Sequence, residues 1–212
     1  QPGDAKPNDK LVILIDEDED GKADREIVFA DGLHLPTGFE FAPEGVYVAQ
    51  GNHLILLRDI DGDDHADVRE TVLSGFDDHD THHVISAFCA DPTGALYMGE
   101  GTFLHSNVET AYGPIRSSNG GFFRFDPQRA QLTRAARLSI PNPWGTAFDD
   151  WGQIFFIDTS DPNLRWMVPG TVNVPYGSFA PNPESLIENA HRVRPTSGLE
   201  FISSRHFPDE VQ

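Results

Sequence analysis

One short motif recurs along the chain at intervals of about fifty residues. Each copy resembles Gly-x-x-Phe, leads into an apolar run, and is followed by a tight turn and a second apolar run. The matched positions are Phe41, Ala90, Phe148 and Phe201, at spacings of 49, 58 and 53 residues. A propeller blade occupies about 40–50 residues of chain, and its blades repeat in this way. The repeat therefore predicts an all-β fold of the β-propeller type, with loop insertions in the longer intervals.

The local pattern agrees with this prediction, because short apolar runs alternate with turn residues along most of the chain. No helical periodicity of ten or more residues persists between the glycines and prolines. About four repeats fit into the 212 residues. We therefore expect an incomplete ring of about four blades over residues 11–212, truncated at its C-terminal end, behind a disordered lead over residues 1–10. A complete β-sandwich with accidental spacing is the alternative.

Charge and cysteine content exclude several classes of protein. The formal net charge of −19 disfavours nucleic acid and anionic membrane surfaces as partners, since both require a basic face. The single cysteine, Cys89, excludes an intrachain disulfide and a zinc site built from several cysteines. No run approaches the 18 apolar residues of a membrane-spanning helix, so we expect no direct membrane insertion. No signal peptide is visible, which leaves the compartment open.

Two aspartate-rich loops repeat the same spacing 43 residues apart. In each loop, aspartates occupy positions 1, 3, 5 and 9, with a glycine at position 6 in the first (Gly21) and at position 4 in the second (Gly62). Ca²⁺ takes six to eight oxygen ligands, and alternate aspartates in a tight turn bring carboxylates together. We therefore predict two structural Ca²⁺ sites, with these ligands: Asp16, Asp18, Asp20 and Asp24 in the first, and Asp59, Asp61, Asp63, Asp67 and Glu70 in the second.

Predicted strands flank both loops, so the loops belong to hairpins rather than to EF-hands. The alternative is a pair of Asx turns that need no ion. Segments 16–26 and 59–70 hold 13 of the 34 acidic residues, and the mutual repulsion of so many carboxylates favours a bound cation.

The loops that enter the innermost strands of a propeller converge at one end of its channel. Here they carry His34, the run Asp77–His83, Asn142 and Arg194. An imidazole beside a carboxylate suits a general base, so His82, His83 and Asp80 are the predicted catalytic residues. Strand alternation lets only one of the two adjacent histidines point inward, and we prefer His83. The alternative is that these histidines are packed blade residues. His105, in a long insert, is a further candidate for the same face.

Several motifs in order resemble the membrane-bound dehydrogenase propeller, the N-terminal module of the haem-binding Cys-x-x-Cys-His proteins of planctomycete-type bacteria. The resemblance runs from about residue 11 to residue 212 and includes these segments: Asp80-Thr81-His82-His83, His105–Thr110, Asn119–Phe125, Asn142-Pro143-Trp144-Gly145 and Arg194–Phe201. It implies an exported, periplasmic or extracellular protein. It also implies that a c-type haem domain outside this chain is the partner.

The chain is more distantly similar to the soluble glucose/sorbosone dehydrogenases, which are six-bladed propellers that use pyrroloquinoline quinone and Ca²⁺. This likeness implies six blades in the whole protein, a sugar or alcohol substrate, and Asn142 and Arg194 as quinone contacts. One departure stands against the quinone, because Ile140-Pro141 precede Asn142 where those relatives place an arginine.

Two functions therefore remain open. The first is the propeller module of an exported oxidoreductase that oxidises a sugar or alcohol with a quinone and passes electrons to the haem domain. The second is a non-catalytic, Ca²⁺-stabilised propeller that binds glycan or protein. The histidine cluster favours the first, whereas the missing arginine and the aspartate loops favour the second. The pattern assigns Trp144, Trp151 and Trp166 to packing between blades.

Overall fold

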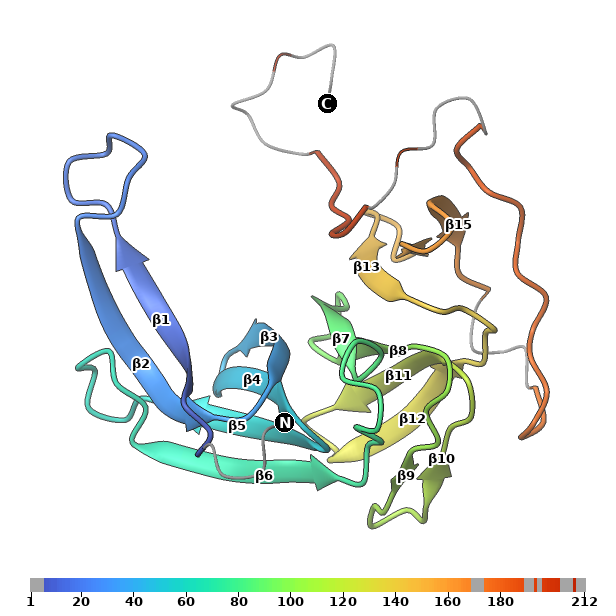
Figure 1. Cartoon of the computed structure of the whole chain (residues 1–212), viewed down its shortest axis with the longest axis horizontal. Coiled ribbons are helices and arrows are strands. Elements are labelled where there is room, and N and C mark those ends of the chain that lie inside the picture. The colour runs from blue at the N-terminus through green and yellow to red at the C-terminus, as the bar shows by residue number, and fades with distance from the viewer. Residues whose placement is uncertain (1–5, 169–173, 189–192, 194–195, 203–207, 209–212) are drawn as a thin grey trace.

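The structure is a computed structural model that describes residues 6–168, 174–188, 193, 196–202 and 208. Over these residues it is all-β, and its strands form five antiparallel sheets (Figure 1). The strands are β1 (Asp9–Ile15), β2 (Arg25–Leu33), β3 (Pro36–Ala42), β4 (Gly45–Gln50), β5 (His53–Arg58), β6 (Val68–Ser74), β7 (Ser86–Ala90), β8 (Leu96–Glu100), β9 (Asn107–Val108), β10 (Ile115–Arg116), β11 (Gly121–Asp126), β12 (Gln131–Ala136), β13 (Pro143–Phe148), β14 (Ile154–Asp158) and β15 (Asn163–Trp166).

The chain opens with the β1–β2 hairpin, which packs on the first large sheet. That sheet has the order β3-β4-β5-β6, and its outer face buries Val48 and Ile55 against Ala30 and Leu33 of β2. β1 begins at Asp9, so the strand starts within the segment expected to be a disordered lead. The hairpin is therefore part of the packed structure rather than an appendage to it.

The second large sheet has the order β12-β11-β8-β7, in which β8 and β11 are neighbours although they are not consecutive in the chain. The insert between β8 and β11 carries the small β9–β10 hairpin. One buried cluster joins this sheet to the first, with Leu54 and Phe76 on one side and Met98, Phe123 and Phe125 on the other. The two sheets therefore stack face to face, as neighbouring blades do.

The third sheet, β13-β14-β15, stacks on the second through a cluster that includes Phe122 and Phe156. The fourth copy of the repeat lies beside it without regular strand pairing. Its Gly198 N–H donates to the Trp144 carbonyl (2.9 Å), and the rings of Phe201 and Phe155 are 5.5 Å apart. The described part of the fourth repeat thus sits where a further innermost strand begins.

The repeat marks the innermost strands, as predicted. β3, β7 and β13 carry the first three copies and lie next to one another where the sheets meet. Figure 1 shows the sheets following one another around an arc, which the described residues do not close. The architecture is therefore of the β-propeller type. The short apolar runs predicted as strands fall within observed strands, and these runs are 11–15, 46–49, 54–57, 96–98, 122–125 and 154–157.

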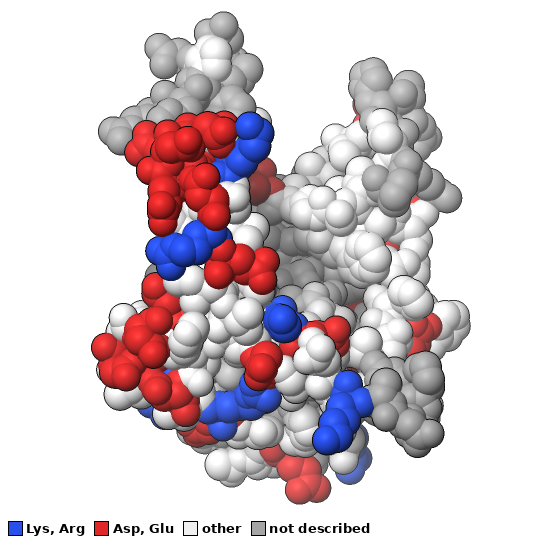
Figure 2. Space-filling view, turned by 60° about the vertical axis from the view of Figure 1, so that its left-hand side comes forward, with Lys and Arg blue, Asp and Glu red and all other residues white. Residues whose placement is uncertain are grey.

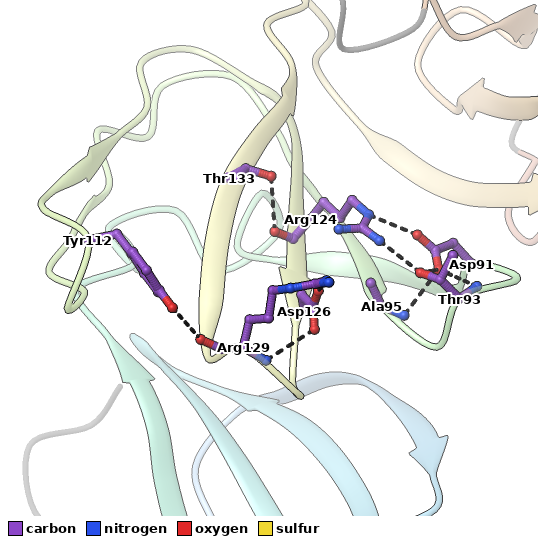
Figure 3. Close-up of polar contacts among 8 residues, drawn as sticks. All are labelled: Asp91, Thr93, Ala95, Tyr112, Arg124, Asp126, Arg129 and Thr133. Atoms are coloured by element: carbon purple, nitrogen blue, oxygen red, sulfur yellow. Dashed lines mark hydrogen bonds and ion pairs between the residues drawn. The ribbon is translucent and has the colours of Figure 1, made fainter.

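A hydrogen-bonded turn joins each of the later innermost strands to the next strand, and Figure 3 shows the turn that begins at Asp91. Asp91 begins the β7–β8 turn and accepts hydrogen bonds from the Ala95 N–H (3.1 Å) and from Nε of Arg124 on β11 (2.8 Å). Asp149 begins the β13–β14 turn and accepts a bond from the Gln153 N–H (2.7 Å) in the same way. The repeat therefore extends from the strands to the turns between them.

Candidate functional site at the channel mouth

Two adjoining hollows lie where the innermost strands begin. One, of about 330 Å³, is lined by Thr37, Thr81, His82, Val84, Ser86, Ala87, Trp144 and Ser197. The other, of about 650 Å³, is lined by Asp80, His82, His83, Asn142, Trp144, Thr159 and Ser160. His82 and Trp144 belong to both linings. The structure therefore brings together Asp80, His82, His83 and Asn142, whereas Arg194 lies outside the described residues.

Asp80 is the centre of the predicted catalytic group. Its Oδ1 accepts a hydrogen bond from the His82 N–H (3.1 Å) and lies 3.4 Å from Nδ1 of the His82 ring. Its Oδ2 lies 3.2 Å from Nδ1 of His83. The His82 N–H, with the nearby histidines, holds the pKa of the Asp80 carboxyl below its usual range despite some desolvation. One ionised carboxylate therefore faces two imidazoles.

The two histidines differ sharply in exposure, and this corrects the preference for His83. The His82 side chain is 81% exposed, whereas that of His83 is 11% exposed. The His83 ring packs on Phe103 of the insert, with ring centroids 5.7 Å apart, and its carbonyl accepts the Gly101 N–H (2.9 Å). Its Nδ1 makes no hydrogen bond of good geometry within the described structure. His83 therefore anchors the insert, and His82 is the histidine open to a ligand.

Close backbone contact at Gly101 explains why the insert begins with a glycine. A Cβ there would lie 2.2 Å from the Pro141 carbonyl oxygen and 2.9 Å from Cβ of His83. Any side chain would separate the insert from the two loops beside it. The insert therefore packs closely beside His83 and Pro141, whereas the expectation that it folds over the same face finds no support in the two linings, which include none of its residues.

The opposite wall is built around Asn142. Its amide donates to the Ser160 hydroxyl, and its carbonyl accepts the Thr159 N–H (3.0 Å). Behind it, Asp158 is buried, and burial raises the pKa of its carboxyl although the N–H groups of Asn142 and Ser160 act in the other direction. Asn142 is therefore held in place from both sides and presents a fixed polar wall to the larger hollow.

A buried carboxylate braces the loop that carries Asp80. Glu100 is 0% exposed and accepts hydrogen bonds from the hydroxyls of Ser106 and Ser117, with Arg134 Nη1 at 3.9 Å. Burial raises the pKa of Glu100 and lowers that of Arg134 to about 10. The Ser106 hydroxyl also accepts the Asp77 N–H (2.8 Å). The interior of the second sheet is thereby connected to the loop over residues 76–83.

The same loop forms a third hollow beside the first two. Asp77, Asp78 and His79 bring their ligand atoms within 4.8 Å of one another, and His105 lies in the same lining. Partial burial would raise the pKa of Asp77, but hydrogen bonds from the His105 N–H and from His79 outweigh it and lower that pKa. His105 thus supports this loop through its backbone (2.7 Å to Asp77 Oδ2) and lines no part of the hollows that contain His82.

The two aspartate loops lie away from the channel mouth, at the tip of the β1–β2 hairpin and between β5 and β6. Figure 2 shows acidic side chains gathered in separate areas over these two parts of the molecule. Positions 1, 3 and 9 of each loop converge within 4.8 Å, and these residues are Asp16, Asp18 and Asp24, and Asp59, Asp61 and Asp67.

The remaining predicted ligands do not join these groups. Oδ1 of Asp20 accepts the Lys22 N–H (2.9 Å), and Oδ1 of Asp63 accepts the His65 N–H (2.9 Å). Glu70 lies on β6 with its carboxylate 3.4 Å from Arg58 Nη2. The structure therefore brings three carboxylates together in each loop rather than four or five.

The sequence interpretation missed Trp144, Thr159 and Ser160 as site residues. Trp144 was assigned to packing, yet its side chain is 38% exposed and lines both hollows. Its place in the repeat is a signal that could have found it, because Trp144 precedes the matched residue Phe148 by four. Thr159 and Ser160 follow β14 and carry no comparable signal.

The antiparallel sheets, the shared channel mouth and the repeat define a protein of the β-propeller type. The chain belongs to the family described as Domain of unknown function (DUF7133), whose model matches residues 1–207. No curated protein matches the chain. Within the described ranges, no helix is long and apolar enough to cross a membrane.

One of three similar solved structures supports the fold. A protein assigned as a gluconolactonase aligns at 16% identity over 82% of this chain and 56% of its own, with a TM-score of 0.53. A luciferin-regenerating enzyme aligns at 13% identity over 63% of this chain and 42% of its own (TM-score 0.45), and a glucose dehydrogenase at 14% over 66% and 46% (TM-score 0.41). This chain thus spans about half the length of these solved chains.

Proposed function

We propose that this chain is the substrate-binding propeller module of a sugar or alcohol oxidoreductase, and that the channel mouth holds a substrate hydroxyl against His82. The observation that carries the proposal is the contact of one ionised carboxylate, Asp80, with an exposed imidazole at the meeting point of two hollows. A family of dehydrogenase-type propellers with the same Asp-Thr-His-His segment adds support.

The chemistry follows from the position of Nδ1. Asp80 lies 3.4 Å from Nδ1 of His82, so a protonated Nδ1 would leave Nε2 as the basic nitrogen of a ring that lines both hollows. Nε2 would accept the proton of a bound hydroxyl, and Asp80 would stabilise the imidazolium that results. Proton transfer of this kind contributes about 10²–10⁴ to a rate. The Asn142 amide, fixed by Ser160, would orient the substrate from the facing wall.

Pyrroloquinoline quinone does not fit the described lining. The quinone carries three carboxylates and needs cationic partners, yet the described residues around the two hollows include no lysine or arginine and do include Asp80. The predicted contact Arg194 lies outside the described residues. We therefore assign no step to the quinone. Oxidation of the hydroxyl-bearing carbon also removes a hydride, so a two-electron acceptor must reach the bound substrate, and in the assay below the added dye would fill that role.

A dye-linked assay tests the proposal with the chain and a panel of sugars and alcohols. We expect His82→Gln to lower turnover by about 100-fold or more, with substrate affinity changed little. Asp80→Asn should lower turnover as well, because the imidazole loses its orienting anion. His65→Gln, in the exposed second aspartate loop, is the matched control and should behave as the wild type. Full turnover in His82→Gln would refute the role of His82.

An assay with added quinone distinguishes the two candidate functions, which are oxidation of a sugar or alcohol and binding without chemistry. Quinone absorbance is read with pyrroloquinoline quinone and Ca²⁺ present, before and after sugar is added. Reduction of the quinone on sugar addition would support oxidation and would contradict the poor fit described above. Sugar binding in calorimetry, without turnover with any acceptor, would favour the second candidate, a propeller that binds glycan without chemistry.

Ca²⁺ would stabilise the fold at the two aspartate loops. Three carboxylates in each loop, within 4.8 Å of one another, are hard oxygen ligands of the kind that Ca²⁺ prefers. Repulsion among them without a cation adds to the case. These ions would be structural, because neither loop lines the channel mouth.

The cellular setting of the proposal rests on the family resemblance. We propose that the protein is exported to the periplasm or beyond and that a c-type haem domain accepts its electrons. The test is reduction of the haem of the full-length protein, followed at its absorption band after substrate is added. An unchanged haem spectrum in the presence of a substrate that the chain binds would contradict this electron path.

A further inference from the structure

The same position of each repeat faces the smaller hollow. Counting four residues back from the matched positions Phe41, Ala90, Phe148 and Phe201 gives one residue per repeat, and all of these residues line that hollow: Thr37, Ser86, Trp144 and Ser197. Three of them carry hydroxyls, and one carries an indole. Each repeat therefore contributes one side chain to the channel from an equivalent backbone position.

A shift of strand register lies at or next to three of these positions. The pairing of β3 with β4 shifts between Pro36 and Gly38, and that of β13 with β14 shifts between Pro143 and Gly145. The pairing of β7 with β8 shifts between Ser86 and Cys89. Bulges of this kind redirect a side chain and are common beside binding sites. In β3 and β13 the residue skipped by the pairing is the lining residue itself, Thr37 or Trp144, whereas in β7 the shift follows Ser86, which pairs with Gly99.

The chemistry of this set suits a polyhydroxylated ring. The Trp144 indole offers a broad apolar face, and the axial C–H groups of a pyranose pack on such a face. Thr37 donates its hydroxyl proton to the Ile85 carbonyl (2.8 Å), so toward a ligand its oxygen acts as an acceptor. Ser86 and Ser197 supply hydroxyls that can donate or accept.

We propose that these four positions are the specificity-determining residues of the channel, and that they select a cyclic sugar over an open-chain polyol through stacking on Trp144. This inference rests on the proposed function, since it names the substrate class of the same site. His82 and Asp80 would supply the proton transfer, whereas Trp144 and the three hydroxyls determine which molecule is held beside them.

Calorimetry with D-glucose and D-sorbitol tests the proposal on the full chain. Trp144→Leu keeps apolar bulk but removes the ring face, and we expect it to weaken glucose binding by about tenfold while sorbitol affinity changes by less than about twofold. Trp144→Phe should restore most of the glucose affinity. Trp151→Phe is the matched control, because that tryptophan is exposed in the β13–β14 turn, away from the hollows, and should change neither affinity.

The outcomes distinguish this inference from the proposed function. If Trp144→Leu leaves glucose binding intact, or weakens glucose and sorbitol equally, stacking selectivity is refuted while the site itself stands. Ser86→Ala should weaken both ligands by a similar factor, since both lose one hydrogen bond, and an unchanged affinity would remove Ser86 from the set. Wild-type chain that binds neither ligand would overturn the inference together with the proposed function.

Discussion

The two aspartate loops have the same backbone conformation but differ in their contacts with the rest of the fold. Positions 4 and 6 have positive φ in both loops, at Glu19 and Gly21 (60° and 86°) and at Gly62 and Asp64 (82° and 67°). Two hydrogen bonds also recur. The N–H at position 6 donates to the aspartate at position 1, as in Gly21 to Asp16 and Asp64 to Asp59. The N–H at position 2 donates to the aspartate at position 9, as in Glu17 to Asp24 and Ile60 to Asp67. The aspartate spacing thus determines the loop conformation by itself, although the glycine stands at position 6 in the first loop and at position 4 in the second.

The two aspartate loops differ in how firmly they are attached to the rest of the fold. The first loop closes the tip of the β1–β2 hairpin, which projects from the first sheet in Figure 1. The second is tied to that hairpin, because the Ala66 N–H donates to the Phe29 carbonyl (2.8 Å) and Arg69 donates to the Asp31 carbonyl (2.5 Å). The comparison teaches that the same local geometry can be coupled weakly or strongly to the rest of the fold.

Ca²⁺ removal should give the largest effect, and it should be unequal between the loops. At a hundred times its dissociation constant, a ligand bound only by the folded state adds about 2.7 kcal/mol. We expect Asp59→Asn to remove more of the Ca²⁺-dependent rise in melting temperature than Asp16→Asn, because the second loop is tied to the packed hairpin. Melting in Ca²⁺ and in chelator measures this, with Asp31→Asn as control. Equal losses would contradict the difference in coupling.

The non-glycine residues with positive φ offer the next largest effect. A left-handed conformation costs an ordinary residue about 1–2 kcal/mol, and aspartate tolerates it better. Glu19→Gly should therefore raise the free energy of unfolding by about 1 kcal/mol, and Asp64→Gly should raise it by less. Urea unfolding in chelator measures both changes. Glu17→Gly, at a residue outside the positive-φ set, is the matched control and should destabilise the chain. A loss of stability in Glu19→Gly would refute the strain.

The two loops should bind Ca²⁺ with the same number of carboxylates. Glu70 pairs with Arg58 rather than with the aspartates of the second loop, so Glu70→Gln should leave Ca²⁺ affinity within about twofold. Asp61→Asn should lower the affinity of that loop by about tenfold or more, because a converging carboxylate is lost. Calorimetric Ca²⁺ titration measures both variants. A large loss in Glu70→Gln would restore the fifth ligand predicted from the sequence.

The smallest expected effect is on the loss of folding stability at low pH, and it arises from Asp59. A hydrogen bond from the Gly62 N–H, joined by further backbone donors, lowers the pKa of Asp59 below its ordinary value of 3.8. A carboxyl with a depressed folded-state pKa contributes stability above its unfolded pKa, and that contribution is lost as the pH falls through the folded value. Asp59→Asn should therefore flatten the loss of stability below about pH 4 in chelator. An unchanged acid limb in urea unfolding would contradict this.

The sequence predicted those features that depend on local spacing. Matched positions located the innermost strands, and the aspartate spacing located both hairpin loops. The outward turn of Asp20 and Asp63 could not be predicted, because it depends on which backbone N–H groups the folded loop presents. His82 and His83 exchanged their expected roles for a similar reason. Burial of His83 requires Phe103 and Gly101 of the insert, which are distant in sequence.

Trp144 shows the same limit at the level of strand pairing. An aromatic residue in an innermost strand normally packs between blades, and its sequence neighbours give no sign of a register shift. The shift exists only once β13 pairs with β14. The repeat places Trp144 at the position equivalent to Thr37 and Ser86, but only the structure shows that residues at this position line a hollow.

The order of strands within the sheets also bears on how the chain folds. In the first and third large sheets, every strand pairs with the strand that precedes or follows it along the chain, and in the second only the short β9–β10 insert intervenes. Contacts of low sequence separation require little loop closure and form quickly. Each sheet can therefore assemble as soon as its own residues leave the ribosome, and the chain can fold from its N-terminal end, one blade after another.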